Sequence, residues 1–88
     1  MHFDWDIEKN QSLIEERGVC FEDVVVAINE NALLDIIKHP NQDKYPSQKI
    51  YIVELNSYIY MVPFVYNQDK IFLKTIIPSR KMNQRYKK

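Results

Sequence analysis

Three runs of β-branched and aromatic residues, joined by very short turns, dominate the second half of the chain. The runs cover residues 49–55, 58–66 and 70–77. Asn56-Ser57 is typical of a two-residue hairpin turn, and Asn67-Gln68-Asp69 turns the chain again. Consecutive strands with turns this short pair antiparallel, because a parallel connection needs a dozen or more residues. The sequence therefore predicts an antiparallel meander, in which Pro63 produces a bulge or marks an edge position.

A fourth strand is predicted ahead of these three. Residues 33–37, Leu-Leu-Asp-Ile-Ile, form a short apolar run that ends at His39-Pro40. A strand is favoured there, and continuation of a preceding helix is the alternative. Residues 39–48 then form a polar loop with two prolines, and a loop of this length in a small domain is often functional.

The first third of the chain has helical patterns. Asp6 is a suitable N-cap and Gly18 a suitable stop, which predicts a helix over 7–17. One face of this helix is expected to carry Ile7, Leu13, Ile14 and, at its margin, Asn10. A second helix is predicted from near Cys20 to Asn29, although Val24-Val25-Val26 favours a strand by propensity. Cys20 has no basic neighbour in the sequence, so an ordinary thiol is expected.

The chain ends in a polar and basic segment. Ser79 can cap a short helix over the last residues, and a frayed arm is the alternative. We therefore predict one α+β domain over residues 1–88. In this fold two N-terminal helices pack on a four-stranded antiparallel meander, and a short basic helix follows at the C-terminus.

The charges are unevenly distributed along the chain. The whole sequence has 12 basic and 12 acidic residues and no net charge. Residues 1–43 hold three basic and ten acidic residues, a net charge of −7, whereas residues 44–88 hold nine and two, a net charge of +7. This asymmetry suggests that one surface binds a polyanion, although solvated helix and strand faces are the simpler explanation.

Composition excludes several classes of protein. One glycine leaves no room for a glycine-rich nucleotide-binding loop, and two histidines with one cysteine are too few for a typical metal site, so no cofactor and no metal are predicted. No apolar run is long enough to span a membrane. The acidic start of the chain lacks the basic region of a signal peptide, so a cytoplasmic location is expected. A domain this small also gains stability from a partner or from homo-oligomerisation.

The strongest candidates for binding a polyanion lie near the C-terminus. Lys81 and Arg85 are four residues apart and share a helix face, with Arg80 beside them. Arginine suits phosphate because its planar guanidinium holds two oxygens at once. Lys74 precedes them on the last predicted strand, and Tyr86 offers a ring that can stack on a base. We therefore predict RNA contacts by Lys81, Arg85 and Tyr86.

The polar loop supplies the candidates for proton transfer. His39 is the only histidine in this region, and imidazole has an ordinary pKa near neutrality, so it can act as a general acid or base. Lys44 in the same loop is the alternative. In a meander the start of this loop and the end of the last strand can approach the same end of the sheet. His39 and Lys44 are therefore predicted to join Lys74 and Arg80 in a catalytic site.

Two motifs resemble a known family. The start of the chain, Phe3-Asp4-Trp5-Asp6 with Lys9-Asn10 and then Gly18-Val19 with Phe21-Glu22-Asp23, resembles the opening of the BrnT-type toxins of bacterial type II toxin–antitoxin systems. The segment Ile77-Pro78-Ser79-Arg80, with Tyr86 further on, resembles the end of that family. The chain differs from the family pattern at Arg17, Cys20 and Pro78-Ser79, where the family often has His, Ser or Thr, and Ser-Ala.

The resemblance implies a fold, an activity and a partner. It implies a RelE-like ribonuclease fold, cleavage of messenger RNA that inhibits translation and growth, and neutralisation by a small DNA-binding antitoxin encoded alongside. Of the candidate residues, Arg80 corresponds to the family's arginine, and we expect it to stabilise charge with help from Lys74 or Lys81. Two alternatives stay open, namely a non-catalytic protein with the toxin fold that binds nucleic acid or the antitoxin, and a housekeeping RNA-binding module without an antitoxin.

Overall fold

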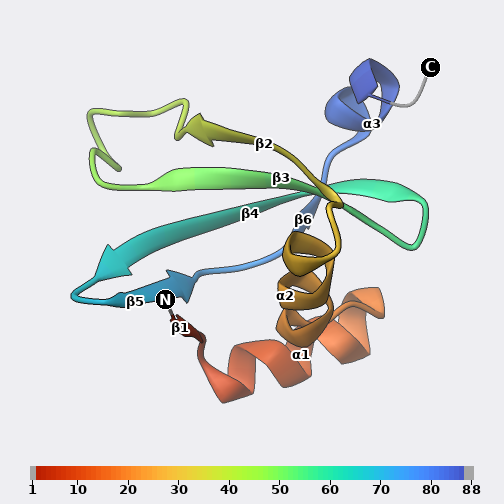
Figure 1. Ribbon diagram of the computed structural model, residues 1–88, viewed down its shortest axis with the longest axis horizontal. Helices are drawn as coiled ribbons and strands as arrows, with labels where there is room; N and C mark the ends of the chain where they lie inside the picture. Colours follow the sequence, from red (N-terminus) through yellow and green to blue (C-terminus); the bar gives the residue numbers. More distant parts are fainter. Residues whose placement is uncertain (1, 87–88) are drawn as a thin grey trace.

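The computed structural model describes residues 2–86, which form three helices and one mixed sheet of six strands (Figure 1). In chain order the elements are β1 (His2–Asp4), α1 (Ile7–Arg17), α2 (Phe21–Asn29), β2 (Leu33–Lys38), β3 (Lys49–Leu55), β4 (Tyr58–Asn67), β5 (Lys70–Leu73), β6 (Ile77–Pro78) and α3 (Arg80–Tyr86). The strand order across the sheet is β1-β5-β4-β3-β2, and β6 pairs with β4.

The predicted fold, with a four-stranded antiparallel meander, is therefore wrong, since the sheet has two more strands and is mixed. The strand missing from the prediction is β1, which pairs parallel with β5 so that Phe3 lies opposite Ile71. A three-residue strand shows almost no alternation, and its partner lies near the other end of the chain. No local pattern could therefore reveal this pairing.

The predicted last strand, 70–77, is interrupted in the structure and forms β5 and β6. Phe64 on β4 lies opposite Leu73, whereas Met61 lies opposite Ile77, so residues 74–76 face only two residues of β4. Lys74 donates its backbone N–H to the carbonyl oxygen of Pro63 at 2.8 Å. The nitrogen of Pro63 also points toward the strand that contains Lys74, but it carries no hydrogen and cannot donate. The hydrogen-bond pattern between β4 and this strand is therefore interrupted at Pro63.

The β3–β4 hairpin is the centre of the sheet and is buried on both faces. Asn56 and Ser57 both have positive φ angles, 52° and 64°, as a type I′ turn requires. The two faces carry different clusters. Tyr51, Val53, Leu55, Val62 and Phe64 face α1 and α2, whereas Ile50, Ile52 and Ile59 form a second cluster with Met82 and Tyr86 of α3. The helices α1 and α2 thus cover one face, and α3 covers part of the other.

The helix α1 begins and ends at the predicted residues, but only part of its predicted face is buried. Asp6 accepts a hydrogen bond from the backbone N–H of Lys9, and Gly18 adopts the left-handed conformation with φ of 67°. Ile7 is 83% exposed and Ile14 44% exposed, whereas Asn10 and Leu13 are buried. The helix therefore turns a polar residue toward the core.

Asn10 is buried because it joins α1 to the start of α2. Its Oδ1 accepts the backbone N–H of Phe21 at 2.8 Å, and its Nδ2 donates to Oε1 of Glu22 at 2.8 Å. Cys20, at the N-cap position of α2, makes no capping hydrogen bond with its side chain. Asn10 therefore caps α2 from another helix, and the same contact lowers the pKa of Glu22.

Replacing Asn10 should destabilise the whole domain. Asn10→Ala leaves the buried N–H of Phe21 without a partner, which should reduce the free energy of unfolding by about 2 kcal/mol. Urea denaturation monitored by circular dichroism measures the loss. Gln11→Ala, at the exposed neighbouring position, should change it by less than about 0.5 kcal/mol. Equal midpoints for the two variants would contradict the capping role.

The Glu22 contact makes part of this effect depend on pH. A carboxyl group whose pKa is lowered by folding stabilises the protein above its unfolded pKa, about 4.3, and loses that contribution as the pH falls through the folded pKa. The difference in unfolding free energy between the wild type and Asn10→Ala should therefore be smaller at pH 3 than at pH 7. A difference that grows on acidification would show that Glu22 takes no part.

Candidate nucleic-acid interface

The short helix α3 is held against the sheet by hydrogen bonds to one residue of β4. The backbone N–H of Ser79 donates to the carbonyl oxygen of Ile59 at 3.0 Å, and the N–H of Ile59 donates to Oδ1 of Asn83 at 3.2 Å. Ser79 also caps the helix, because its Oγ accepts the N–H of Met82 at 3.2 Å. These contacts fix where α3 begins and which side it turns to the sheet.

The inner side of α3 is apolar. Met82 and Tyr86 pack on the cluster formed by Ile50, Ile52 and Ile59. The Tyr86 hydroxyl donates to Oδ2 of Asp35 on β2 at 3.2 Å, and partial burial raises its pKa. The ring was predicted to stack on an RNA base. In the structure it packs against the sheet, with the Arg85 guanidinium 5.9 Å from its centroid.

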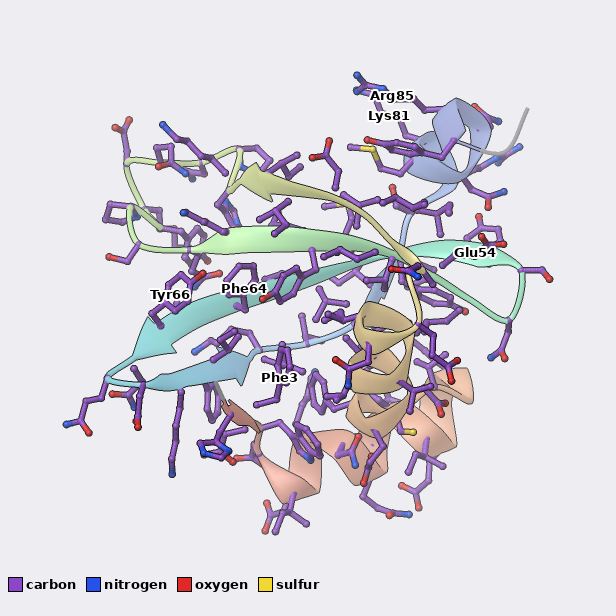
Figure 2. The ribbon with its side chains drawn as sticks, in the orientation of Figure 1. Phe3, Glu54, Phe64, Tyr66, Lys81 and Arg85 are labelled. Atoms are coloured by element: carbon purple, nitrogen blue, oxygen red, sulfur yellow. The ribbon has the colours of Figure 1, made fainter. Side chains whose placement is uncertain are left out.

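The outer side of α3 is basic. Arg80, Lys81 and Arg85 are exposed, and we call these three residues the basic ridge. Lys81 and Arg85 lie on the same side of α3 (Figure 2). Because the inner side is already satisfied by packing and hydrogen bonds, the ridge is free to meet phosphate oxygens from solvent.

Lys74 is exposed but lies apart from the ridge. Its backbone N–H bonds to Pro63, four residues along β4 from Ile59, where α3 begins. Four residues of strand span about 13 Å. The Lys74 ammonium group lies 5.5 Å from the centroid of the Phe72 ring. The backbone of Lys74 therefore lies about 13 Å along the sheet from the start of α3.

The predicted proton-transfer residues lie at the other end of the sheet. The loop after β2 opens beyond Lys38 and Lys49, which are paired, and Lys49 lies opposite Phe64 on β4. Five residues separate Phe64 from Ile59, or about 17 Å of strand. In Figure 1 this loop and α3 lie at opposite ends of the sheet. Arg80, Lys81 and Arg85 thus share the short helix α3, whereas His39 and Lys44 lie in the loop at the other end of the sheet.

Within its loop, His39 is held by local contacts. Its Nδ1 accepts the backbone N–H of Asn41 at 3.0 Å, and its ring centroid lies 4.4 Å from that of Tyr45. The neutral ring therefore carries its hydrogen on Nε2. The Lys44 ammonium group lies 5.4 Å from the same tyrosine centroid. The loop forms a small aromatic and basic group of its own.

The opening motif of the chain has structural roles. The Trp5 ring stacks on Phe21 at 5.6 Å, and the Phe3 ring lies 6.5 Å from Tyr51. Arg17, which differs from the family pattern, donates from Nη1 to the carbonyl oxygen of Ile76 at 2.6 Å. No local pattern predicts this contact, because it joins residues almost sixty positions apart. These residues of the motif thus make contacts that stabilise the fold.

Two pockets lie away from the predicted site residues. One, of about 400 Å³, is lined by His2, Phe3, Trp5, Glu22, Val25 and Asn29. A second, of about 350 Å³, lies between α2 and the β3–β4 turn and includes Asp23, Glu30 and Glu54. Three carboxylates line the second pocket, which makes it a poor site for a polyanion. Burial raises the pKa of the Cys20 thiol, which lines neither pocket.

Between residues 2 and 86, no group of three His, Cys, Asp or Glu side chains is arranged to hold a metal ion. In the same part of the chain, no helix is long and apolar enough to cross a membrane.

Removing the Tyr86 ring should release α3 from the sheet. Tyr86→Ala deletes the ring from the second cluster and should reduce the free energy of unfolding by about 2 kcal/mol. Tyr86→Phe keeps the ring and loses the bond to Asp35, at a cost of about 0.5–1 kcal/mol. Hydrogen exchange should show faster exchange of the α3 amides in Tyr86→Ala alone. Unchanged exchange would mean that the bonds to Ile59 suffice to hold the helix.

Comparison with known proteins adds no relative. No model of a known protein family matches the chain, and no curated protein matches it significantly. The resemblance to the BrnT-type toxins therefore rests on the motif residues themselves.

Proposed function

We propose that this protein is a toxin of a type II toxin–antitoxin system that acts on RNA through α3. The observation that carries the proposal is the two-sided character of this helix. Its inner side is fixed to the sheet by Ser79, Met82 and Asn83, and its outer side presents the basic ridge. The ridge begins at Arg80, the residue that the resemblance to BrnT-type toxins marks. An arginine on a helix that hydrogen bonds hold against the sheet suits the binding of a phosphodiester.

The reaction we propose is cleavage of messenger RNA by its own 2′-hydroxyl group. The 2′-oxygen attacks the adjacent phosphorus, the bond to the 5′-oxygen breaks, and the products are a cyclic phosphate and a free 5′-hydroxyl. The phosphorane-like transition state carries extra negative charge, which Arg80 would stabilise with help from Lys81. His39 and Lys44 remain candidates for proton transfer, and Lys74 for charge stabilisation. Each of them could act in this reaction only if a conformational change or the path of the bound RNA brought it close to the phosphate at Arg80.

That separation favours a second candidate function. His39 and Lys44 lie about 17 Å of strand away from the start of α3, so no proton-transfer group from the loop stands beside Arg80. A toxin-fold protein that binds RNA or an antitoxin without cleaving RNA fits this arrangement. In that case the basic ridge is a binding surface alone.

The partner we propose is a small DNA-binding antitoxin encoded next to this gene. An acidic segment laid across Arg80, Lys81 and Arg85 would neutralise the ridge and block RNA. A cytoplasmic location belongs to the same proposal, because messenger RNA and the antitoxin are found there.

Arg80→Ala tests the proposal. Induced expression of the wild type should stop growth and fragment messenger RNA, and Arg80→Ala should restore growth by removing the charge that stabilises the transition state. Lys70→Ala is the matched control, because it removes an exposed positive charge from the far end of the sheet. Growth curves and RNA electrophoresis follow the two effects, with soluble protein quantified in each culture.

Each outcome has a distinct meaning. Growth arrest with intact RNA that still requires Arg80 would favour the non-catalytic alternative. Full toxicity of a well-expressed Arg80→Ala protein would contradict the assignment of Arg80. Coexpression of the neighbouring gene should abolish the toxicity of the wild type.

A further inference from the structure

A row of aromatic side chains crosses the sheet at the end opposite α3. The rings of Tyr51 and Phe64 stack at 4.0 Å with an interplanar angle of 12°, and Tyr66 meets Phe64 edge-on at 5.7 Å and 83°. Tyr51 and Phe64 are buried, whereas Tyr66, the last of the row, is 54% exposed. Buried rings therefore hold Tyr66 in place while its own surface is open to solvent.

The helices leave this part of the sheet uncovered. Tyr66 shares its face with Phe64, because the two are two residues apart on β4, and this is the face that α1 and α2 cover elsewhere. The end of the sheet with the β4–β5 turn projects beyond both helices (Figure 1). Tyr66 and Phe64 lie there, at the other end of the molecule from Lys81 and Arg85 (Figure 2).

Two lysines stand beside the exposed ring. The Lys49 ammonium group lies 6.0 Å from the centroid of Tyr66, and Lys49 is paired directly with Lys38 on β2. Like charges directly opposite each other across two antiparallel strands are destabilising. Within residues 2–86, no ion pair with a carboxylate neutralises either lysine. An anion bound between them would remove the repulsion.

The loop and strand ends around Tyr66 also carry aromatic and basic side chains. The loop that begins directly after Lys38 adds the Tyr45 ring, with Lys44 over it. Three lysines, Lys38, Lys44 and Lys49, lie on the strand ends and the loop of this region, together with Asp43 in the loop and Asp69 in the β4–β5 turn. Exposed aromatic rings beside lysines, on the open face of a sheet, are the chemistry that binds single-stranded nucleic acid.

We propose that this end of the sheet is a base-stacking site for single-stranded RNA, with Tyr66 under one base and Lys49 and Lys38 on the flanking phosphates. The inference rests on the proposed function for its ligand, RNA, but uses none of the residues of the basic ridge. Stacking accepts every base, so the site contributes affinity with little sequence preference. It also gives His39 and Lys44 a place beside RNA that does not require them to reach Arg80.

The test measures RNA binding by the purified full-length chain. The probe is a short fluorescein-labelled oligouridylate with 2′-O-methyl groups, which lacks the 2′-hydroxyl nucleophile and so is not cleaved, and fluorescence anisotropy gives Kd. Tyr66→Ser should weaken binding about five- to a hundredfold, and Tyr66→Phe, which keeps the ring, should bind as the wild type does. Thermal unfolding followed by circular dichroism checks the fold of each variant.

A pair of charge variants provides an independent measurement. Lys49→Gln and Lys70→Gln remove the same charge, but Lys70 alternates with the buried Ile71 of β5 and so lies on the other face of the sheet. Lys49→Gln should weaken binding more and should lower the slope of log Kd against log salt by about 0.7, as expected for one lost phosphate contact to a single strand.

The outcomes separate the two proposals. Loss of affinity in Tyr66→Ser and Lys49→Gln, with Tyr66→Phe and Lys70→Gln unchanged, supports the stacking site. Tight binding that depends on Arg80, Lys81 and Arg85 and not on Tyr66 or Lys49 overturns the stacking site and leaves the proposed function intact. A wild type that does not bind the probe, while Arg80-dependent toxicity persists, also overturns the stacking site. Absence of both binding and toxicity overturns the proposed function as well.

Discussion

The antiparallel pairing of β3 with β4 sets the position of every other element. The Asn56-Ser57 turn places Leu55 opposite Tyr58 and so fixes the register of the whole hairpin. That register assigns Tyr51 and Val53 to one face and Ile50 and Ile52 to the other. A shift by one residue would exchange these sets, and both α3 and the α1–α2 pair would lose the surfaces on which they pack.

The same hairpin separates the two surfaces that we connect with RNA. At its turn, Ile59 uses both of its backbone groups to hold α3. At its open end, Phe64 supports the exposed ring of Tyr66 on the opposite face. An RNA strand that touched both would have to pass around the sheet, so the two surfaces act as separate contacts. This separation is the physical reason that the residues predicted for one site lie in two places.

The motif that resembles BrnT-type toxins reports on the fold more than on the chemistry. Trp5 packs on Phe21, and Asn10 joins α1 to α2 through the backbone N–H of Phe21 and the carboxylate of Glu22. These contacts assemble the acidic helical layer, far along the chain from Arg80. What the resemblance implies about function therefore depends on the second motif, Ile77-Pro78-Ser79-Arg80 with Tyr86, which continues into α3.

Local chemistry determined much of the structure. Asp6 and Gly18 bound α1 because capping and the left-handed conformation depend on neighbouring residues only, and the runs at 49–55 and 58–66 define β3 and β4 through alternation and a turn of two residues. The basic ridge also follows from helical spacing, once Ser79 caps α3.

Other features of the structure depend on contacts between residues that are far apart in the sequence, and only the tertiary structure shows them. Three contacts join segments that share no local pattern. They are the pairing of β1 with β5, the cap that Asn10 supplies to α2, and the hydrogen bond from Arg17 to the carbonyl oxygen of Ile76. The separation of His39 from Arg80 and the uncovered ring of Tyr66 depend on sheet register and on how far the helices extend. The sequence by itself thus determined which residues are basic or aromatic. Only the folded sheet decided which of them share a surface, because burial and pairing across the sheet are set by all strands together.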